Sequence, residues 1–176
     1  KFIDAKQDLS IQVHPTDELA KKRHNSKGKT EMWYVMDATP DATLIYGFTH
    51  EISHQEFERR IKDNTLLEVC NQVPIKKGDV FFIEAGTLHA IGAGALIAEI
   101  QQSSNSTYRV YDYGRVGKDG KLRELHIEKA LAVTKLEPPT RKPEPIAKLT
   151  AFADYDLTIL AQCELFNVSH FDLHGN

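Results

Sequence analysis

Cysteine is scarce in this sequence, and no motif built on cysteine is present. The 176 residues include two cysteines, Cys70 and Cys163, which lie far apart and form no Cys-x-x-Cys pair. Disulfide frameworks need several cysteines at short spacings, so the pattern predicts free thiols. We therefore expect a reduced, cytoplasmic setting.

Long hydrophobic runs and an excess of positive charge are lacking as well. The longest run of apolar residues and glycine spans residues 90–98, whereas a membrane helix needs about 20 residues. No charged start followed by an apolar stretch marks a secretory signal. With 22 basic and 25 acidic residues, the formal net charge is −3, which argues against a general basic surface for nucleic acid. We expect neither a membrane nor a nucleic acid as a partner.

The remaining composition is ordinary for a folded domain. The hydrophobic fraction of 41% suffices for a buried core, and charged residues make up 27%. The chain opens on the strand-like triplet Lys1-Phe2-Ile3 and closes on a strand-like segment, residues 165–173, followed by a turn. We expect that segments are missing at both ends.

Most of the chain has the pattern of short β-strands separated by turns. The predicted strands cover residues 9–14, 31–36, 43–48, 80–83, 95–100 and 106–113. Helical spacing occurs at residues 53–62, which begin with the capping box Ser53 and Glu56, and at residues 125–136. Many strands with few helices favour an antiparallel sandwich or barrel, such as a jelly roll.

Four prolines fall within residues 137–145 and predict an extended linker. This linker divides the sequence into a main β domain, residues 1–136, and the start of a second, incomplete β domain, residues 146–176. The sequence has no internal repeat and carries no signal for an oligomeric state.

The strand predicted at residues 9–14 alternates between apolar and polar side chains. Its odd-numbered side chains are apolar and belong to the core, whereas the opposite face carries Ser10, Gln12 and His14. This polar face must either meet solvent or line a cavity.

Residues 78–89 combine two glycine turns with a buried strand. They read G-D-V-F-F-I-E-A-G-T-L-H, so an apolar strand follows the first turn and the second turn presents His89 at the start of the next strand. Because the apolar run must be buried, we expect His89 at the mouth of a barrel, where small barrels commonly hold their ligands.

These residues resemble the cupin superfamily. Gly78, Gly86 and His89 match its second motif, with Glu84 in place of the usual proline. Four ordered segments together resemble the class I phosphomannose isomerases in their shorter bacterial form: Q-V-H-P at 12–15, G-K-T-E-M-W-Y at 28–34, G-T-L-H-A-I at 86–91 and T-Y-R-V-Y-D-Y at 107–113.

The resemblance covers residue 1 to about residue 136 and has several implications. It implies a mostly β cupin jelly roll (a double-stranded β-helix) with short helical insertions and part of a second β unit. It also implies a chain truncated at both ends. The implied activity is zinc-dependent interconversion of mannose 6-phosphate and fructose 6-phosphate, with a small sugar phosphate as the partner.

By the same resemblance, one zinc ion per chain has the ligands Gln12, His14, Glu31 and His89. Two imidazoles, one carboxylate and one amide oxygen suit Zn²⁺, and a set without thiolate favours a catalytic over a structural zinc site. A divalent ion there keeps a net charge of about +1 and can polarise a sugar carbonyl or hydroxyl. The same ligands could instead hold Fe²⁺ in an oxygenase.

Arg109 and Lys29 are the catalytic candidates. Aldose–ketose isomerisation develops negative charge on an enediol, which a fixed guanidinium at Arg109 would stabilise. The alternative is a structural arginine paired with a carboxylate such as Asp112. Lys29 shares a strand face with Glu31, and the resemblance implies that it contacts the substrate and transfers a proton. The alternative is a solvated lysine in a basic loop at residues 21–29.

Two further residues are candidates for substrate binding. Lys1 matches the family's phosphate-side lysine, and Ser10 offers a hydroxyl on the face that carries Gln12. One departure is Asn105, where family members often carry an aspartate implicated in ring opening. An amide cannot act as a general base, so another group would have to open the ring. A cupin that binds a sugar phosphate without turnover therefore stays open as an alternative.

Overall fold

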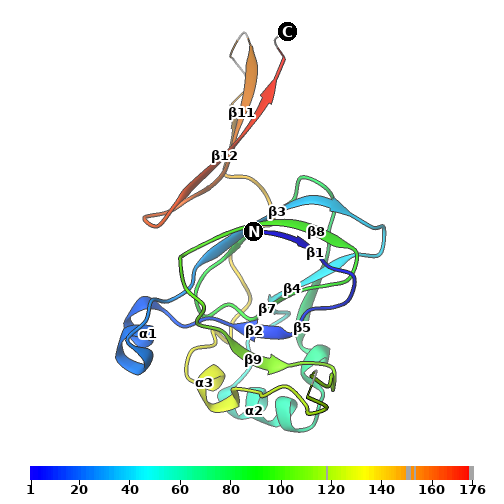
Figure 1. Ribbon diagram of the computed structural model, residues 1–176, viewed down its shortest axis with the longest axis vertical. Coiled ribbons are helices and arrows are strands. Elements are labelled where there is room, and N and C mark those ends of the chain that lie inside the picture. Colours follow the sequence, from blue (N-terminus) through cyan, green and yellow to red (C-terminus); the bar gives the residue numbers. More distant parts are fainter. Residues whose placement is uncertain (118, 150–151, 153, 175–176) are drawn as a thin grey trace.

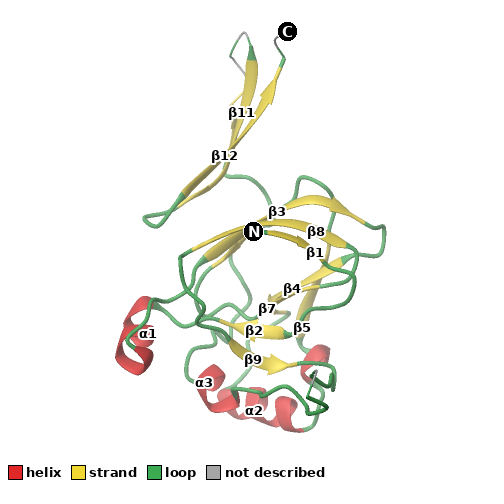
Figure 2. Ribbon diagram, viewed as in Figure 1, coloured by secondary structure: helices red, strands yellow, loops and turns green. Residues whose placement is uncertain are grey.

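The computed structural model describes residues 1–117, 119–149, 152 and 154–174. Two antiparallel sheets face each other as a barrel, helices α2 (His54–Lys62) and α3 (Ile127–Leu131) lie beneath the lower sheet, and a three-stranded sheet projects above the upper one (Figure 1). Strands and loops make up most of the molecule (Figure 2). The prediction of a mostly β jelly roll with short helical insertions is confirmed.

Both sheets of the barrel are antiparallel throughout. The upper sheet has the order β1 (Phe2–Asp4), β8 (Ala95–Gln101), β3 (Glu31–Ala38) and β6 (Val80–Ile83). The lower sheet has the order β5 (Cys70–Pro74), β4 (Thr43–Phe48), β7 (His89–Ile91), β2 (Ile11–Val13) and β9 (Tyr108–Tyr111). The six predicted strands are all present, whereas the edge strand β5 was missed because Asn71 and Gln72 interrupt its apolar pattern.

Alternation along β3 separates two layers of packing. Trp33 and Val35 pack between the two sheets, against Phe81 and other buried side chains. Met32 faces the opposite side of the upper sheet, where it contacts the base of the projecting sheet. Because side chains alternate along a strand, one face of β3 packs in the barrel core and the other face packs against the projecting sheet.

A second core lies between the lower sheet and two helices, α2 (His54–Lys62) and α3 (Ile127–Leu131). The amide of Glu56 donates to Oγ of Ser53 at 3.0 Å, so the predicted capping box does start α2. Helix α3 is shorter than the predicted segment 125–136, because the chain turns back to the barrel after Leu131. No helix in the described part of the chain is long and apolar enough to cross a membrane.

Helix α1 (Asp17–His24) corrects the prediction of a basic loop at residues 21–29. Thr16 caps its first turn, and Asn25 ends it in the left-handed conformation at φ 48°. Among its residues only Ala20 is buried, so the helix has no apolar stripe. The sequence pattern missed α1 for that reason, since periodic burial is the main signal of a helix.

The proline-rich segment, residues 137–145, runs along the barrel. The amide of Val80 donates to the carbonyl of Pro143 at 3.4 Å, and the guanidinium of Arg141 lies 4.1 Å from the ring centre of Phe82. Beyond this segment, β10 (Ala147–Leu149), β11 (Tyr155–Gln162) and β12 (Asn167–Leu173) form the projecting sheet. The division into two domains stays a prediction.

Candidate active site

Three predicted ligands meet inside the barrel. His14 follows β2, His89 begins β7, and Glu31 begins β3 in the facing sheet. One donor atom from each lies within 4.8 Å of the others, and all three side chains are buried. The polar face of the strand around Gln12 thus faces the interior of the barrel rather than solvent.

Backbone carbonyls fix both imidazole rings. Nδ1 of His14 lies 2.9 Å from the carbonyl oxygen of Ser106, and Nδ1 of His89 lies 2.8 Å from that of Thr87. A carbonyl only accepts, so each Nδ1 carries the proton and donates it. In the neutral form of both rings, Nε2 therefore presents a lone pair to the cluster.

The spacing of the donor atoms fits a metal ion. The two Nε2 atoms of His14 and His89 are 3.1 Å apart. Glu31 places Oε2 3.4 Å from the first and Oε1 3.6 Å from the second. Ligand atoms around a tetrahedral zinc ion at about 2.0–2.1 Å are about 3.3–3.4 Å apart. Lone pairs at these distances repel one another, and a bound cation would remove that repulsion.

The charge state of the cluster also suits a cation. Burial opposes the ionisation of Glu31, but its contacts with His14, His89 and Lys29 outweigh burial and hold its pKa well below the usual value. Burial is also the main reason that the pKa of His89 falls to about 3. Within the described residues, both carboxylate oxygens of Glu31 are buried without a well-aligned hydrogen bond. An anionic carboxylate thus faces an unprotonated imidazole, as metal binding requires.

Gln12 stands beside this cluster. It pairs in register with His89 on β7, and its Nε2 lies 3.4 Å from Nε2 of His89. The amide nitrogen therefore faces the ring. Rotation of the terminal amide by half a turn would present Oε1, the atom that could bind a metal.

Lys29 is buried against the same cluster. Its Nζ lies 2.8 Å from Oε2 of Glu31 and 3.2 Å from Nε2 of His14, and the residue is 5% exposed. The alternative of a solvated lysine is therefore wrong for the structure. The ammonium thus directly contacts two of the three predicted ligands in this cluster.

Arg109 lies in the same transverse row of the lower sheet as two predicted ligands. Its register partner is Gln12, which in turn pairs with His89, and directly paired residues of antiparallel strands share a face. Its Nη1 donates to the carbonyl of Glu124 at 2.9 Å, while Nε is buried without a hydrogen-bond partner among the described residues. Burial, followed by the charge of Arg123, lowers the pKa of Arg109.

The carboxylate that was the alternative partner for Arg109 is engaged elsewhere. Asp112 forms ion pairs with Arg115 and Arg123, and the described residues include no ion pair for Arg109. The guanidinium of Arg109 is thus held by a backbone carbonyl, with its charge left available to an anion.

The two predicted substrate-binding residues lie at different depths. Ser10 is buried just before β2. Lys1 is exposed, and its Nζ contacts Oε1 of Glu99 at 3.0 Å and Oε1 of Gln101 at 2.6 Å. Gln101 pairs in register with Glu31, so Lys1 is linked through β8 and β3 to the cluster of His14, Glu31 and His89.

Sequence patterns missed the two carbonyls that orient the histidines. Thr87 lies inside the motif around His89, but any residue there supplies a carbonyl. Ser106 is 92 positions from His14, and backbone contacts of this kind leave no mark on residue identity.

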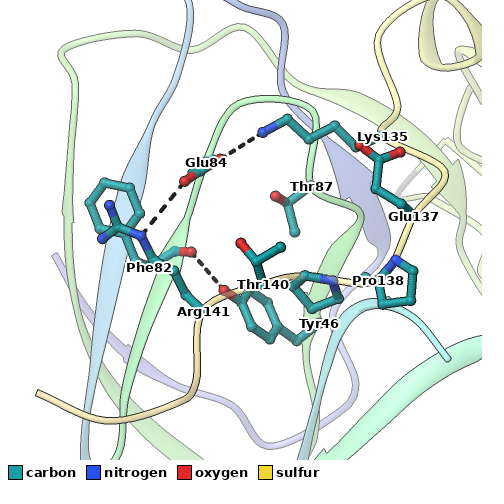
Figure 3. Close-up of a pocket in the computed structure, with 11 residues that line it drawn as sticks. Tyr46, Phe82, Glu84, Thr87, Lys135, Glu137, Pro138, Thr140 and Arg141 are labelled. Carbon is teal, nitrogen blue, oxygen red and sulfur yellow. Dashed lines mark hydrogen bonds and ion pairs between the residues drawn. The ribbon is translucent and has the colours of Figure 1, made fainter. Parts of the chain in front are cut away.

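A separate hollow of about 80 Å³ lies where the proline-rich segment covers the side of the barrel. Figure 3 shows Glu84 between Lys135 and Arg141, with the hydroxyl of Tyr46 donating to the carbonyl of Phe82. The lining residues include none of the predicted ligands or catalytic residues. This hollow is therefore distinct from the cluster of His14, Glu31 and His89.

Known proteins with similar sequences share one name. The mannose-6-phosphate isomerase ManA of Bacillus subtilis is 41% identical over 177 residues, which cover 100% of this chain and 55% of that protein. The mannose-6-phosphate isomerase of Streptococcus mutans is 37% identical over 100% of this chain and 54% of its own length. No protein-family model matches the chain.

The fold agrees with these relatives. The crystal structure of mannose 6-phosphate isomerase from Bacillus subtilis superimposes with a TM-score of 0.90 at 36% identity, over 99% of this chain and 55% of that one. The chain spans about half the length of the curated relatives it matches. It is a homologue of the mannose-6-phosphate isomerases over about half of their length.

Proposed function

We propose that this chain carries the catalytic centre of a zinc-dependent isomerase that interconverts mannose 6-phosphate and fructose 6-phosphate. The observation that supports it most is the buried cluster of His14, Glu31 and His89 with Lys29 in direct contact. The names of the relatives point to the same reaction.

The proposed zinc ligands are His14, Glu31, His89 and, after rotation of its amide, Gln12. Zinc bound there would supply a Lewis acid that polarises a sugar carbonyl or hydroxyl. Ser106 and Thr87 hold the two rings through their carbonyls, which keeps Nε2 aimed at the ion.

Side chains of the protein would stabilise the negative charge that develops on the sugar and transfer the proton. Moving a hydrogen between C1 and C2 of the sugar develops negative charge on oxygen, and the guanidinium of Arg109 would stabilise that charge. Lys29 is our candidate for the proton transfer: as the neutral amine it would take the proton from one carbon, and as the resulting ammonium it would return a proton to the other. Lys1 and Ser10 are proposed to bind the phosphate.

Proton NMR of mannose 6-phosphate in D₂O, with zinc and after chelation, tests this function. We expect fructose 6-phosphate to form only with zinc and to carry deuterium from solvent exchange. The control is a His14→Ala variant, which should be folded but inactive.

A folded, zinc-loaded chain that yields no product would contradict the proposal. Tight binding of mannose 6-phosphate without conversion would then support a sugar-phosphate-binding cupin, as the amide at Asn105 suggests. Oxygen uptake that requires Fe²⁺ would support an oxygenase instead.

A further inference from the structure

Asp112 is a buried carboxylate that binds two arginines at the end of β9. It is 5% exposed, and its Oδ1 accepts from Nη2 of Arg115 at 2.6 Å. Arg123 binds both oxygens in a bidentate fork: its Nε donates to Oδ2 and its Nη2 donates to Oδ1. A two-point fork of this kind fixes orientation as well as distance.

The fork between Arg123 and Asp112 holds the two ends of a loop together, and the chain beyond Arg123 returns to Arg109. Arg123 is followed by Glu124, whose carbonyl accepts from Nη1 of Arg109 at 2.9 Å. Two residues later, the amide of His126 donates to the carbonyl of Arg109 at 2.8 Å. The Glu124 carbonyl thus sits between one anchor at Arg123 and another at His126.

This carbonyl is the only hydrogen-bond acceptor of the Arg109 side chain within the described residues. Nε of Arg109 is buried without a partner, so the direction of the guanidinium depends on how the Glu124 carbonyl is held. If the fork opens, Glu124 keeps a single anchor and its carbonyl can turn away.

Nearby charges also make the guanidinium of Arg109 depend on Asp112. The charges of Arg115 and Arg123 disfavour the cation at Arg109, whereas the carboxylate of Asp112 favours it. Loss of Asp112 would leave three guanidinium groups near one another without their shared anion.

We propose that Asp112 is a positioning residue for Arg109, acting through the Arg123 fork and the Glu124 carbonyl. The proposal rests on the proposed function, in which Arg109 stabilises the charge of the enediolate. Within the described residues the side chain of Asp112 forms its hydrogen bonds with Arg115 and Arg123, and none with His14, Glu31 or His89.

The first test follows the Nε–H signal of Arg109 by ¹H–¹⁵N NMR, assigned by its absence from Arg109→Lys. In Asp112→Asn we expect this buried, unbonded proton to exchange with water about tenfold faster, because loss of the single hydrogen bond from Nη1 to the Glu124 carbonyl lets the guanidinium turn toward solvent by about that factor. Asp119→Asn is the matched control, because among the described residues Oδ1 of Asp119 accepts only from the amide of Lys121 at the tip of the same loop. An Arg109 signal that is unchanged in Asp112→Asn would overturn the proposal.

The second test is a double-mutant cycle on isomerisation. Asp112→Asn should lower kcat about tenfold to a hundredfold with little change in KM, and should change it less than about twofold in an Arg109→Lys background. An equal loss in both backgrounds would overturn the proposal, since Asp112 would then act independently of Arg109. If Asp112→Asn does not fold, Arg123→Lys opens the fork from its exposed side.

The two proposals fail in different ways. An inactive chain, or an Arg109→Lys variant with unchanged kcat, would contradict the proposed function while leaving the NMR result on Asp112 interpretable. A normal Arg109 signal in Asp112→Asn, in a chain that isomerises its substrate, would remove the positioning role alone.

Discussion

Nε2 of His14 lies 3.1 Å from Nε2 of His89, although both rings already donate their Nδ1 protons to backbone carbonyls. Neither neutral ring has a second proton to place between them. A cation would lower the repulsion between the two lone pairs, and the carboxylate of Glu31 could be its third ligand. These three buried side chains are thus placed where they could hold a cation.

Replacement of Glu31 tests the metal site. Glu31→Gln removes the anionic ligand and should weaken zinc binding more than about a hundredfold. At a free zinc concentration a hundredfold above the Kd of the parent chain, the parent should gain about 2.7 kcal/mol in unfolding free energy and the variant less than about 0.4 kcal/mol. Calorimetry and thermal unfolding measure both effects. Glu58→Gln, on the exposed face of α2, is the control, and equal zinc affinities in the two variants would refute the site.

Lys29 should oppose the metal electrostatically. Lys29→Met removes a buried positive charge that contacts His14 and Glu31, so zinc should bind about tenfold tighter or more. Isomerisation should be lost at the same time, because the candidate proton-transfer group is gone. A zinc titration and an isomerisation assay on one preparation measure both. Weaker zinc binding would show that Lys29 supports the metal ligands rather than competing with the ion.

Arg109 should affect turnover but not metal loading. Arg109→Gln removes the guanidinium proposed to stabilise the enediolate and should reduce kcat by about 10²–10³-fold. Zinc content, measured by atomic absorption, should stay at the parent level. Arg59→Gln on α2 serves as a surface control. A variant that turns over at the parent rate would exclude Arg109 from the mechanism.

Gly47 tests the contact between the proline-rich segment and the barrel. Its φ is +69°, and a Cβ there would lie 2.6 Å from Cδ of Pro139. Gly114 has a similar φ of +68°, and a Cβ on it would meet no atom of the described residues within 4 Å. Both alanine variants share the backbone strain, so Gly47→Ala should be less stable than Gly114→Ala by about 1–3 kcal/mol, the cost of the clash.

A protease detects the same contact. If the clash lifts the segment from the barrel, trypsin should cleave after Arg141 faster in Gly47→Ala than in Gly114→Ala. Identical cleavage rates and stabilities in the two variants would mean that Pro139 does not pack on Gly47.

Asp112 should make the free energy of unfolding fall at acidic pH. Burial raises its pKa, but contacts with Arg123 and Arg115 more than offset this and hold the pKa below the usual value of 3.8. The unfolded chain therefore binds this proton more readily, so the stabilisation is complete above about pH 4 and is lost as the pH falls through the folded-state pKa. Urea unfolding at pH 7, 4 and 3 should show a smaller acid loss in Asp112→Asn. A loss equal to that of the parent would contradict the ion pairs.

Local patterns in the sequence determined the elements that have a strong period. Alternation along β2 and β3, and the capping box with Phe57 and Ile61 in α2, predict those elements because a buried face repeats every two or every 3.6 residues. Helix α1 and strand β5 were missed because the helix buries only Ala20 and the strand mixes polar side chains at a sheet edge.

For the candidate site, the sequence by itself supplied the residue types and their order. His14, Glu31 and His89 stand out through motifs, and their roles stay predictions. The tertiary structure alone decided that these three side chains converge, because they come from strands far apart in the chain and from two facing sheets. It also decided which carbonyls orient the rings and that Asp112 binds Arg115 and Arg123 rather than Arg109. Backbone carbonyls are chemically the same in every residue, and ion pairing depends on the path of a loop, so neither can be read from residue identity.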